Sequence, residues 1–340
     1  MGSMWDVGRK ELEDSFSSRR FLAVIGLFVV LCLASVYMGV QSYQQQVDNF
    51  GGGGIYGSAP ELPSLIDVFT PLFSFNMPLT AGILGLLLSY DYISREREEG
   101  TIELLLSYPL YRDEIINGKL ASGVFTVALS LLAAFTISSG LAIYMTGLVP
   151  GMEAFSRLSM IWLGTVVYIT FFLGLGTLLS TVFSSRWRSL ATGIFLLLIF
   201  IGTPFITGIA ADHIYEYEPN QRPTTPEGPV VARGSAASGG TAVERDVSVG
   251  RPSVDEGRSG PSREEVEAKK ERFVSTVSRI SPSASYQNYV NTMIGEQNSE
   301  GLEPTFSESL SSSFGYIIYL ISQTSLVLTA AYGVFLRQDL

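Results

Sequence analysis

Ionisable side chains are scarce in this sequence, and the shortage excludes several classes of protein. Charged residues make up 16% of the 340 residues, and the chain has one histidine and one cysteine. A single cysteine cannot form an internal disulfide framework. The formal net charge is −10, without the clustered basic residues that nucleic acid demands, so we expect no nucleic-acid partner.

Apolar residues are abundant instead, at 46% of the chain with a positive mean hydropathy. A membrane-spanning helix needs about 20 such residues, because each one rises ~1.5 Å across a core of ~30 Å. Six runs are this long and contain no Lys, Arg, Asp or Glu: Phe21–Val40, Phe69–Tyr90, Leu120–Leu148, Leu158–Phe183, Leu190–Ile209 and Phe314–Leu336. We therefore predict an all-α polytopic protein with six transmembrane helices.

The positions of the basic residues predict the orientation, since Lys and Arg of short connections are retained on the cytoplasmic side. The connections before the first span, between the second and third, and between the fourth and fifth carry basic residues. Residues 41–68 carry none, and residues 149–157 carry only Arg157. We expect both termini to be cytoplasmic and the protein to be a multi-pass protein of the plasma membrane.

Residues 1–20 are predicted to form an interfacial helix on the cytoplasmic side. Its apolar residues fall near one helical face: Trp5, Leu12, Phe16 and Phe21. A solvated, frayed N-terminus is an open alternative. The sequence SRRFL also resembles a twin-arginine export signal, but the run after it is long enough to span and five more follow.

The spans and their connections divide the chain into four parts. Residues 21–209 hold the first five helices, and residues 314–340 hold the sixth helix and a cytoplasmic tail. The loop of residues 210–313 is expected outside, because long loops translocate largely regardless of charge. Within it, residues 219–262 are too polar to bury a core and are predicted to be disordered, whereas residues 262–294 carry helical patterns.

The apolar spans carry no candidate for catalysis. An intramembrane hydrolase needs carboxylates, a nucleophile with a base, or metal ligands, and the spans hold no acid. His213 lies at the outer end of the fifth span. The phosphate-binding pattern G-x-x-x-x-G-K-[ST] is absent, because Leu120 follows Lys119 where a hydroxyl residue is required. We predict no catalytic residue, no metal ligand and no cofactor bound by this chain.

Polar residues in the second and fifth spans are candidates for the lining of a pathway: Ser74, Asn76, Thr80, Thr203 and Thr207. The alternative is that they form hydrogen bonds from helix to helix, as polar residues in membranes commonly do. Pro71, Pro78 and Pro204 are expected to bend the same two spans.

The segment of residues 94–119, which we call the coupling segment, combines charge with a short apolar helix. Gly100 permits a turn, Thr101 is a suitable N-cap, and Glu103 complements the helix dipole. Leucines then follow at helical spacing until Pro109 ends the helix. A helix this short is unstable alone. It must therefore pack on its own bundle or insert its apolar side into a soluble partner.

The residues of this segment resemble the signature of ABC-2 type permeases, in particular the stand-alone, NosY-like permeases of that family. The pattern E-x-E-x-G-T-[IL]-E-x-L-L and a trailing G-K join the second and third spans there. The matching residues that we predict to contact an ATPase are Glu96, Glu98, Glu99, Gly100, Thr101, Glu103, Leu105, Leu106, Pro109, Arg112, Gly118 and Lys119. The long loop before the sixth span departs from the compact segment usual in the family.

The resemblance implies the membrane subunit of an ATP-binding cassette transporter, with the topology of type V exporters. It implies two copies of a separate ATPase subunit, which binds ATP and Mg, and a second permease copy, identical or related, within the lipid bilayer. The pathway would export or flip an amphipathic or hydrophobic substrate. The alternative is a non-transporting module that relays motion of the ATPase to an extracytoplasmic partner.

Overall fold

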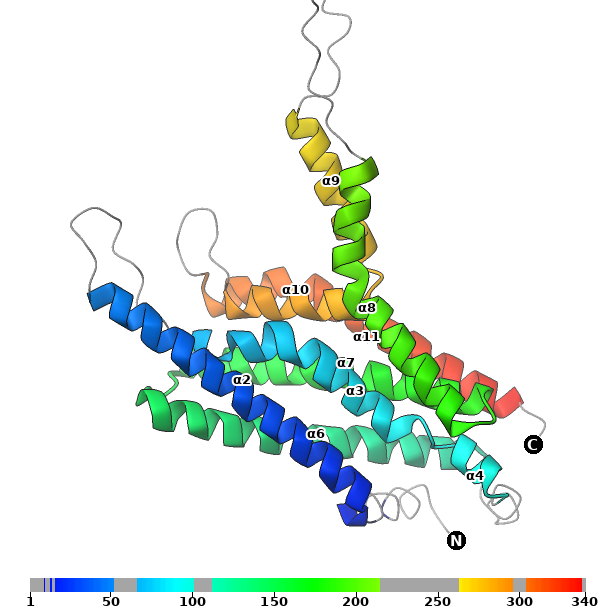
Figure 1. Ribbon diagram of the computed structural model, residues 1–340. Helices are drawn as coiled ribbons and strands as arrows, with labels where there is room; N and C mark the ends of the chain where they lie inside the picture. Colours follow the sequence, from blue (N-terminus) through cyan, green and yellow to red (C-terminus); the bar gives the residue numbers. More distant parts are fainter. Residues whose placement is uncertain are drawn as a thin grey trace, which may run out of the picture. The chain divides into compact units, whose positions relative to one another are not determined.

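The computed structural model describes residues 9, 13, 16–51, 66–100, 112–214, 263–295 and 304–337. All regular structure in these ranges is helical, and Figure 1 shows the helices in chain order. Five of the described helices are long and apolar enough to cross a membrane, or six if one bent pair is a single span. The predictions of an all-helical fold and of a protein that crosses the membrane several times are confirmed.

The five long helices extend beyond the apolar runs that predicted them, since polar flanking residues continue each helix. They are α2 (Arg19–Gly51), α6 (Arg112–Thr146), α7 (Met152–Val182), α8 (Arg186–Ile214) and α11 (Phe306–Arg337). Pro204 lies inside α8 without ending it.

The predicted second span is broken. It consists of a 3-10 turn, η1 (Asp67–Phe69), a π-helical segment, η2 (Pro71–Asn76), and α3 (Met77–Ser89). The helix before Met77 and the helix after it are bent by 49°. Pro71 and Pro78 lack the backbone N–H groups that a regular helix would use, which accounts for a break at this place.

Helix α7 lies at the centre of the first compact unit, which comprises residues 1–206 and 276–340. Tyr168 and Phe172 of α7 are fully buried in its core. The α3 backbone approaches α7 closely at Gly85, where an added Cβ would lie 2.7 Å from the carbonyl oxygen of Ile169. Small residues permit this approach of two membrane helices.

The short helix α10 (Pro282–Ile294) packs against α7 and α11 (Figure 1). Ser281 caps its start, where the side chain accepts a hydrogen bond from the Ala284 amide. Gly295 ends it with φ +88°, in the left-handed region that glycine favours. The Tyr286 ring of α10 stacks on Tyr168 of α7, with 4.5 Å between the ring centroids.

The second compact unit is Thr207–Ser275 and contains the end of α8 and most of α9 (Arg263–Ser278). Within this unit, the Lys270 ammonium donates to the Asp212 carboxylate. The predicted disordered stretch, residues 219–262, lies outside the described residues. Most of the predicted interfacial helix does too, although Arg9 and Glu13 form an ion pair of 3.0 Å.

Candidate functional site

The described part of the coupling segment begins with a single helical turn, α4 (Ser94–Glu98), followed by a turn at Glu99 and Gly100. Glu99 ends the helix, and Gly100 follows with φ +68°. Only glycine adopts this left-handed conformation without steric cost. The chain therefore leaves α4 abruptly at the glycine where the sequence predicted a turn.

Glu96 and Lys119 connect the two ends of the coupling segment. The Lys119 ammonium lies 2.9 Å from a Glu96 carboxylate oxygen, and the two side chains are only 8% and 16% exposed. The ammonium also lies 5.6 Å from the centre of the Tyr92 ring. An ion pair this shielded interacts more strongly than one on the surface. It fixes the start of α6 against α4.

Glu98 joins α4 to the start of α8. Its carboxylate accepts a hydrogen bond of 2.9 Å from the Arg186 backbone amide and another from the Arg186 guanidinium. These two bonds hold the pKa of the Glu98 carboxyl below its usual value, the amide making the larger contribution. Glu99 pairs with Arg95 on the exposed side of α4, at 3.0 Å, and such a surface pair contributes little.

The residues around the start of α4 are bound to the end of α7. The Ser180 hydroxyl oxygen accepts hydrogen bonds of 3.0 Å from the backbone amides of Ile93 and Ser94. The Arg97 guanidinium donates to the carbonyl oxygen of Thr181 at 3.4 Å. The start of α4 therefore contacts α7 directly, through backbone groups as well as side chains.

A partly buried carboxyl, Asp91, lies in the turn between α3 and α4. Burial raises its pKa above the ordinary value, and the nearby Arg95 guanidinium opposes this shift. Two residues further along the chain, Ile93 packs with Ile116 of α6 and Phe335 of α11 in a small apolar cluster. The turn is thus held by apolar packing as well as by ion pairs.

Several of the predicted ATPase-contacting residues lie outside the described ranges, and their role stays a prediction. These residues are Thr101, Glu103, Leu105, Leu106 and Pro109. Arg112 is the first residue of α6, and Gly118 is buried in its second turn. Among the other predicted residues, the structure brings Glu96 and Lys119 together and directs Glu98 to a different partner.

Two of the three predicted pathway residues of the second span, Ser74 and Asn76, form hydrogen bonds to other helices. The Ser74 hydroxyl donates to the Asn291 side chain of α10 at 3.2 Å, and the Asn76 amide donates to the Ser35 hydroxyl of α2. Thr80 bonds to the carbonyl oxygen of Asn76 within its own span. These contacts favour a role in helix packing, the alternative that the sequence left open.

The two predicted pathway residues of the fifth span are Thr203 and Thr207. Thr203 donates to the carbonyl oxygen of Ile199, four residues earlier in α8, at 2.9 Å. Thr207 is buried and belongs to the second compact unit. A lining role for these residues stays a prediction.

Sequence reasoning missed Arg186 and Ser180, which hold α4 in place. Arg186 is one of the basic residues between the fourth and fifth spans, and nothing in its spacing selects Glu98 as the partner. Ser180 lies within a run of small and apolar residues and carries no distinguishing pattern. Hydrogen bonds to backbone amides in a turn depend on the tertiary fold, so the sequence gives no signal for them.

The described residues offer little to a metal or to a phosphate group. Searching them finds no group of three His, Cys, Asp or Glu side chains that could hold a metal ion. In the described part of the coupling segment, the Glu96 carboxylate pairs with Lys119 and the Glu98 carboxylate with Arg186.

These features define a class: a helical membrane protein whose charged turn at α4 is bound to three helices, α6, α7 and α8. The chain matches the ABC-2 family transporter proteins over residues 5–340. It belongs to this family, and the resemblance read from residues 94–119 is confirmed.

Two curated relatives are similar over part of the chain, and both bear the name probable ABC transporter permease protein NosY. The protein of Stutzerimonas stutzeri is 34% identical over 153 residues, which is 45% of this chain and 50% of that protein. The protein of Pseudomonas aeruginosa is 36% identical over 154 residues, with the same coverage. The match thus spans about half the length of these relatives.

Proposed function

We propose that this chain is the permease subunit of an ATP-binding cassette transporter and that its coupling segment contacts a separate ATPase subunit. The observation that carries the proposal is the bracing of residues 94–100 and 112–119. Both ion pairs start from α4: Glu96 pairs with Lys119 of α6, and Glu98 pairs with Arg186 of α8. A force applied to α4 therefore reaches both helices through these two ion pairs.

The family membership and the names of the relatives support the same assignment. In this proposal, two permease copies, identical or related, form the pathway, and each contacts one of two ATPase subunits. ATP and Mg are bound by those partners. Closure of the ATPases would move the helices between inward- and outward-facing arrangements and export or flip an amphipathic substrate, with both chain termini on the cytoplasmic side.

Co-purification tests the contact directly. Glu103 and Leu106 lie at helical spacing in the predicted apolar helix. The double replacement Glu103→Arg, Leu106→Arg reverses the charge at the first position and puts a positive charge in place of an apolar side chain at the second. We expect the variant to lose the ATPase while it elutes as the folded permease. Arg95→Gln, which removes the exposed pair with Glu99 and a positive charge near Asp91, should retain the partner. Retention of the ATPase by the double variant would overturn the proposal.

A second candidate function is a relay to an extracytoplasmic partner, and the separate compact unit Thr207–Ser275 favours it. Deletion of residues 219–262 distinguishes the two. A transporter of small amphiphiles should retain substrate-stimulated ATP hydrolysis after the deletion, whereas a relay should lose its function. Loss of stimulated turnover in a folded, ATPase-bound deletion variant would favour the relay.

A further inference from the structure

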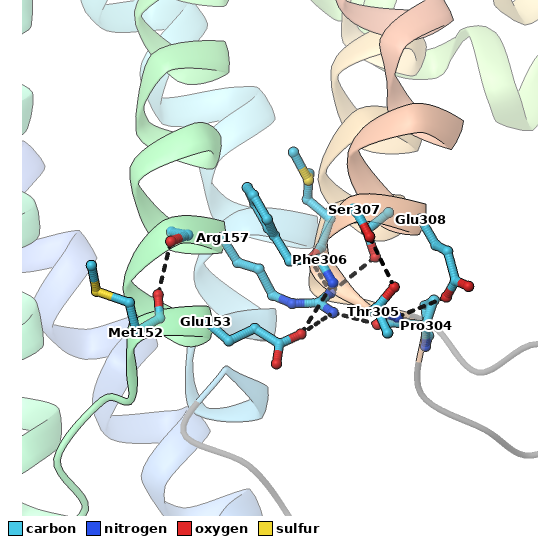
Figure 2. Close-up of polar contacts among 11 residues, drawn as sticks. Met152, Glu153, Arg157, Pro304, Thr305, Phe306, Ser307 and Glu308 are labelled. Atoms are coloured by element: carbon cyan, nitrogen blue, oxygen red, sulfur yellow. Dashed lines mark hydrogen bonds and ion pairs between the residues drawn. The ribbon is translucent and has the colours of Figure 1, made fainter.

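Arg157 is a buried arginine that the coupling segment does not use. It lies on α7, and its side chain is 4% exposed. The guanidinium donates to the Met293 carbonyl oxygen at 2.9 Å, to the Ser309 hydroxyl at 3.0 Å and to the Pro304 carbonyl oxygen (Figure 2). One side chain of α7 thus binds the end of α10 and the start of α11.

Glu153, one turn earlier on α7, completes the arrangement. Its carboxylate accepts hydrogen bonds from Arg157 at 2.9 Å and from the Phe306 backbone amide at 3.1 Å (Figure 2). Phe306 is the first residue of α11, where backbone amides lack partners within the helix. Met293 lies in the last turn of α10, where carbonyl groups lack partners.

The two residues therefore cap two different helices with opposite charges. The cation meets the carbonyl end of α10, and the anion meets the amide end of α11, which is the favourable sign at each helix terminus. Gly295 leaves room for the cation, because a Cβ at this position would lie 3.0 Å from an Arg157 nitrogen. We call Glu153 and Arg157 the α7 clamp.

The α7 clamp lies at the opposite end of α7 from the coupling segment. Thr181, which accepts a hydrogen bond from Arg97, is about 36 Å along the helix axis from Arg157, at ~1.5 Å per residue. Between these ends, α10 is joined to α7 by the Tyr289 hydroxyl, which donates to the Met160 carbonyl oxygen at 2.7 Å. Thr165 and Tyr286 share a further hydrogen bond of 2.9 Å.

We propose that Glu153 and Arg157 are positioning residues that fasten α10 and the start of α11 to α7, so that the three helices move as one body during transport. The movement during transport rests on the proposed function. The fastening itself does not. Motion delivered to α7 near Thr181 would then be carried to α10 at the far end of the helix, where α10 is bonded to the broken second span through Asn291 and Ser74.

Hydrogen exchange of the full chain in lipid nanodiscs tests the fastening. We expect Arg157→Gln to raise amide exchange in the last turn of α10 by about tenfold or more, because bonds to a charged donor are lost. Arg157→Lys should give a smaller increase, since one ammonium cannot reach all the acceptors. The control is Arg279→Gln at the other end of α10, an exposed residue that lies over the Tyr319 ring.

A charge swap distinguishes two explanations: that Glu153 and Arg157 bind the ends of α10 and α11, or that they only form an ion pair within α7. The double variant Glu153→Arg, Arg157→Glu keeps a pair at the same spacing but places an acceptor against the Met293 carbonyl and a donor against the Phe306 amide. We expect α10 exchange as fast as in Arg157→Gln. Wild-type exchange in the swap variant, or in Arg157→Gln, would overturn the proposal.

Spin labels test the common movement in a reconstituted complex with the ATPase. In a Cys32→Ser background, labels at Ser159 of α7 and Asn288 of α10 should keep one narrow distance in the nucleotide-free and vanadate-trapped states. The distribution should broaden in Arg157→Gln. A change of the wild-type distance between the two states would overturn the common movement. If no ATPase binds, the proposed function fails, while the exchange experiment still decides the fastening.

Discussion

Lys119 of α6 and Glu96 of α4 form an ion pair across the base of the coupling segment, with 2.9 Å between the charged atoms. The pair joins α4 to α6 directly. Because both side chains are largely shielded from solvent, breaking the ion pair would lower the free energy of unfolding. The geometry of the proposed ATPase contact therefore depends on residues that do not need to touch the ATPase.

Replacing one partner of this pair should destabilise the protein. We expect Lys119→Met to lower the free energy of unfolding by about 3 kcal/mol, because the shielded Glu96 carboxylate loses the Lys119 ammonium. The measurement is thermal or denaturant unfolding in detergent. The double variant Glu96→Gln, Lys119→Met should lose less than the sum of the two single variants. Additive losses would show that the pair is not a coupled unit.

The Glu98–Arg186 pair should give a pH-dependent contribution of defined sign. The pKa of Glu98 is lowered in the folded protein, so its contribution is complete above the ordinary value of 4.5 and is lost as the pH falls through the folded-state pKa. The melting temperature of Glu98→Gln should lie below that of the wild type near neutral pH, and the two should converge in acid. A difference that persists or grows in acid would contradict the assignment.

Gly39 of α2 should not tolerate a side chain, because a Cβ there would lie 1.9 Å from the backbone carbonyl oxygen of Val68. We expect Gly39→Ala to cost about 2–3 kcal/mol of stability, since α2 must move away from η1. Gly26→Ala is the matched control in the same helix, with no atom within 4 Å, and it should be neutral or stabilising. Unfolding of the two variants under identical detergent conditions compares them.

Tyr168 should hold the broken second span against α7 and α10. Its hydroxyl donates to the Pro78 carbonyl oxygen at 2.6 Å and lies 3.0 Å from the Ser283 hydroxyl. We expect Tyr168→Phe to cost about 1–2 kcal/mol, because the ring still fills its space while the buried bonds are lost. Tyr144→Phe, at an 87% exposed position, should leave the unfolding transition unchanged.

The sequence predicts the class of this fold well, because lipid imposes a length and a composition that can be read directly. Apolar runs identified α2, α6, α7, α8 and α11, and the prolines of the second span indicated where it bends. The helix ends were less predictable. Residues such as Glu153 and Arg157 continue α7 beyond the apolar run. The helix satisfies its own backbone groups there, and the two polar side chains bond to each other.

The candidate site was predictable only as a motif. The pattern around Gly100 indicated a charged turn of the ABC-2 family, but the partners of Glu96 and Glu98 lie far away in the sequence and depend on how α6 and α8 pack. Arg157 offered a weak signal as the only basic residue of its connection. Its role in joining α10 and α11 depends on two helix ends that come together only in the folded chain.

The most direct measurement is the accessibility of the coupling segment, because an ATPase can reach it only from the cytoplasm. In a Cys32→Ser background, Glu99→Cys and Ser307→Cys place single reactive thiols at exposed positions near the two ends of the bundle. A membrane-impermeant maleimide should label Glu99→Cys only in inside-out vesicles and Ser307→Cys only in right-side-out vesicles. Labelling of Glu99→Cys in right-side-out vesicles would contradict the account.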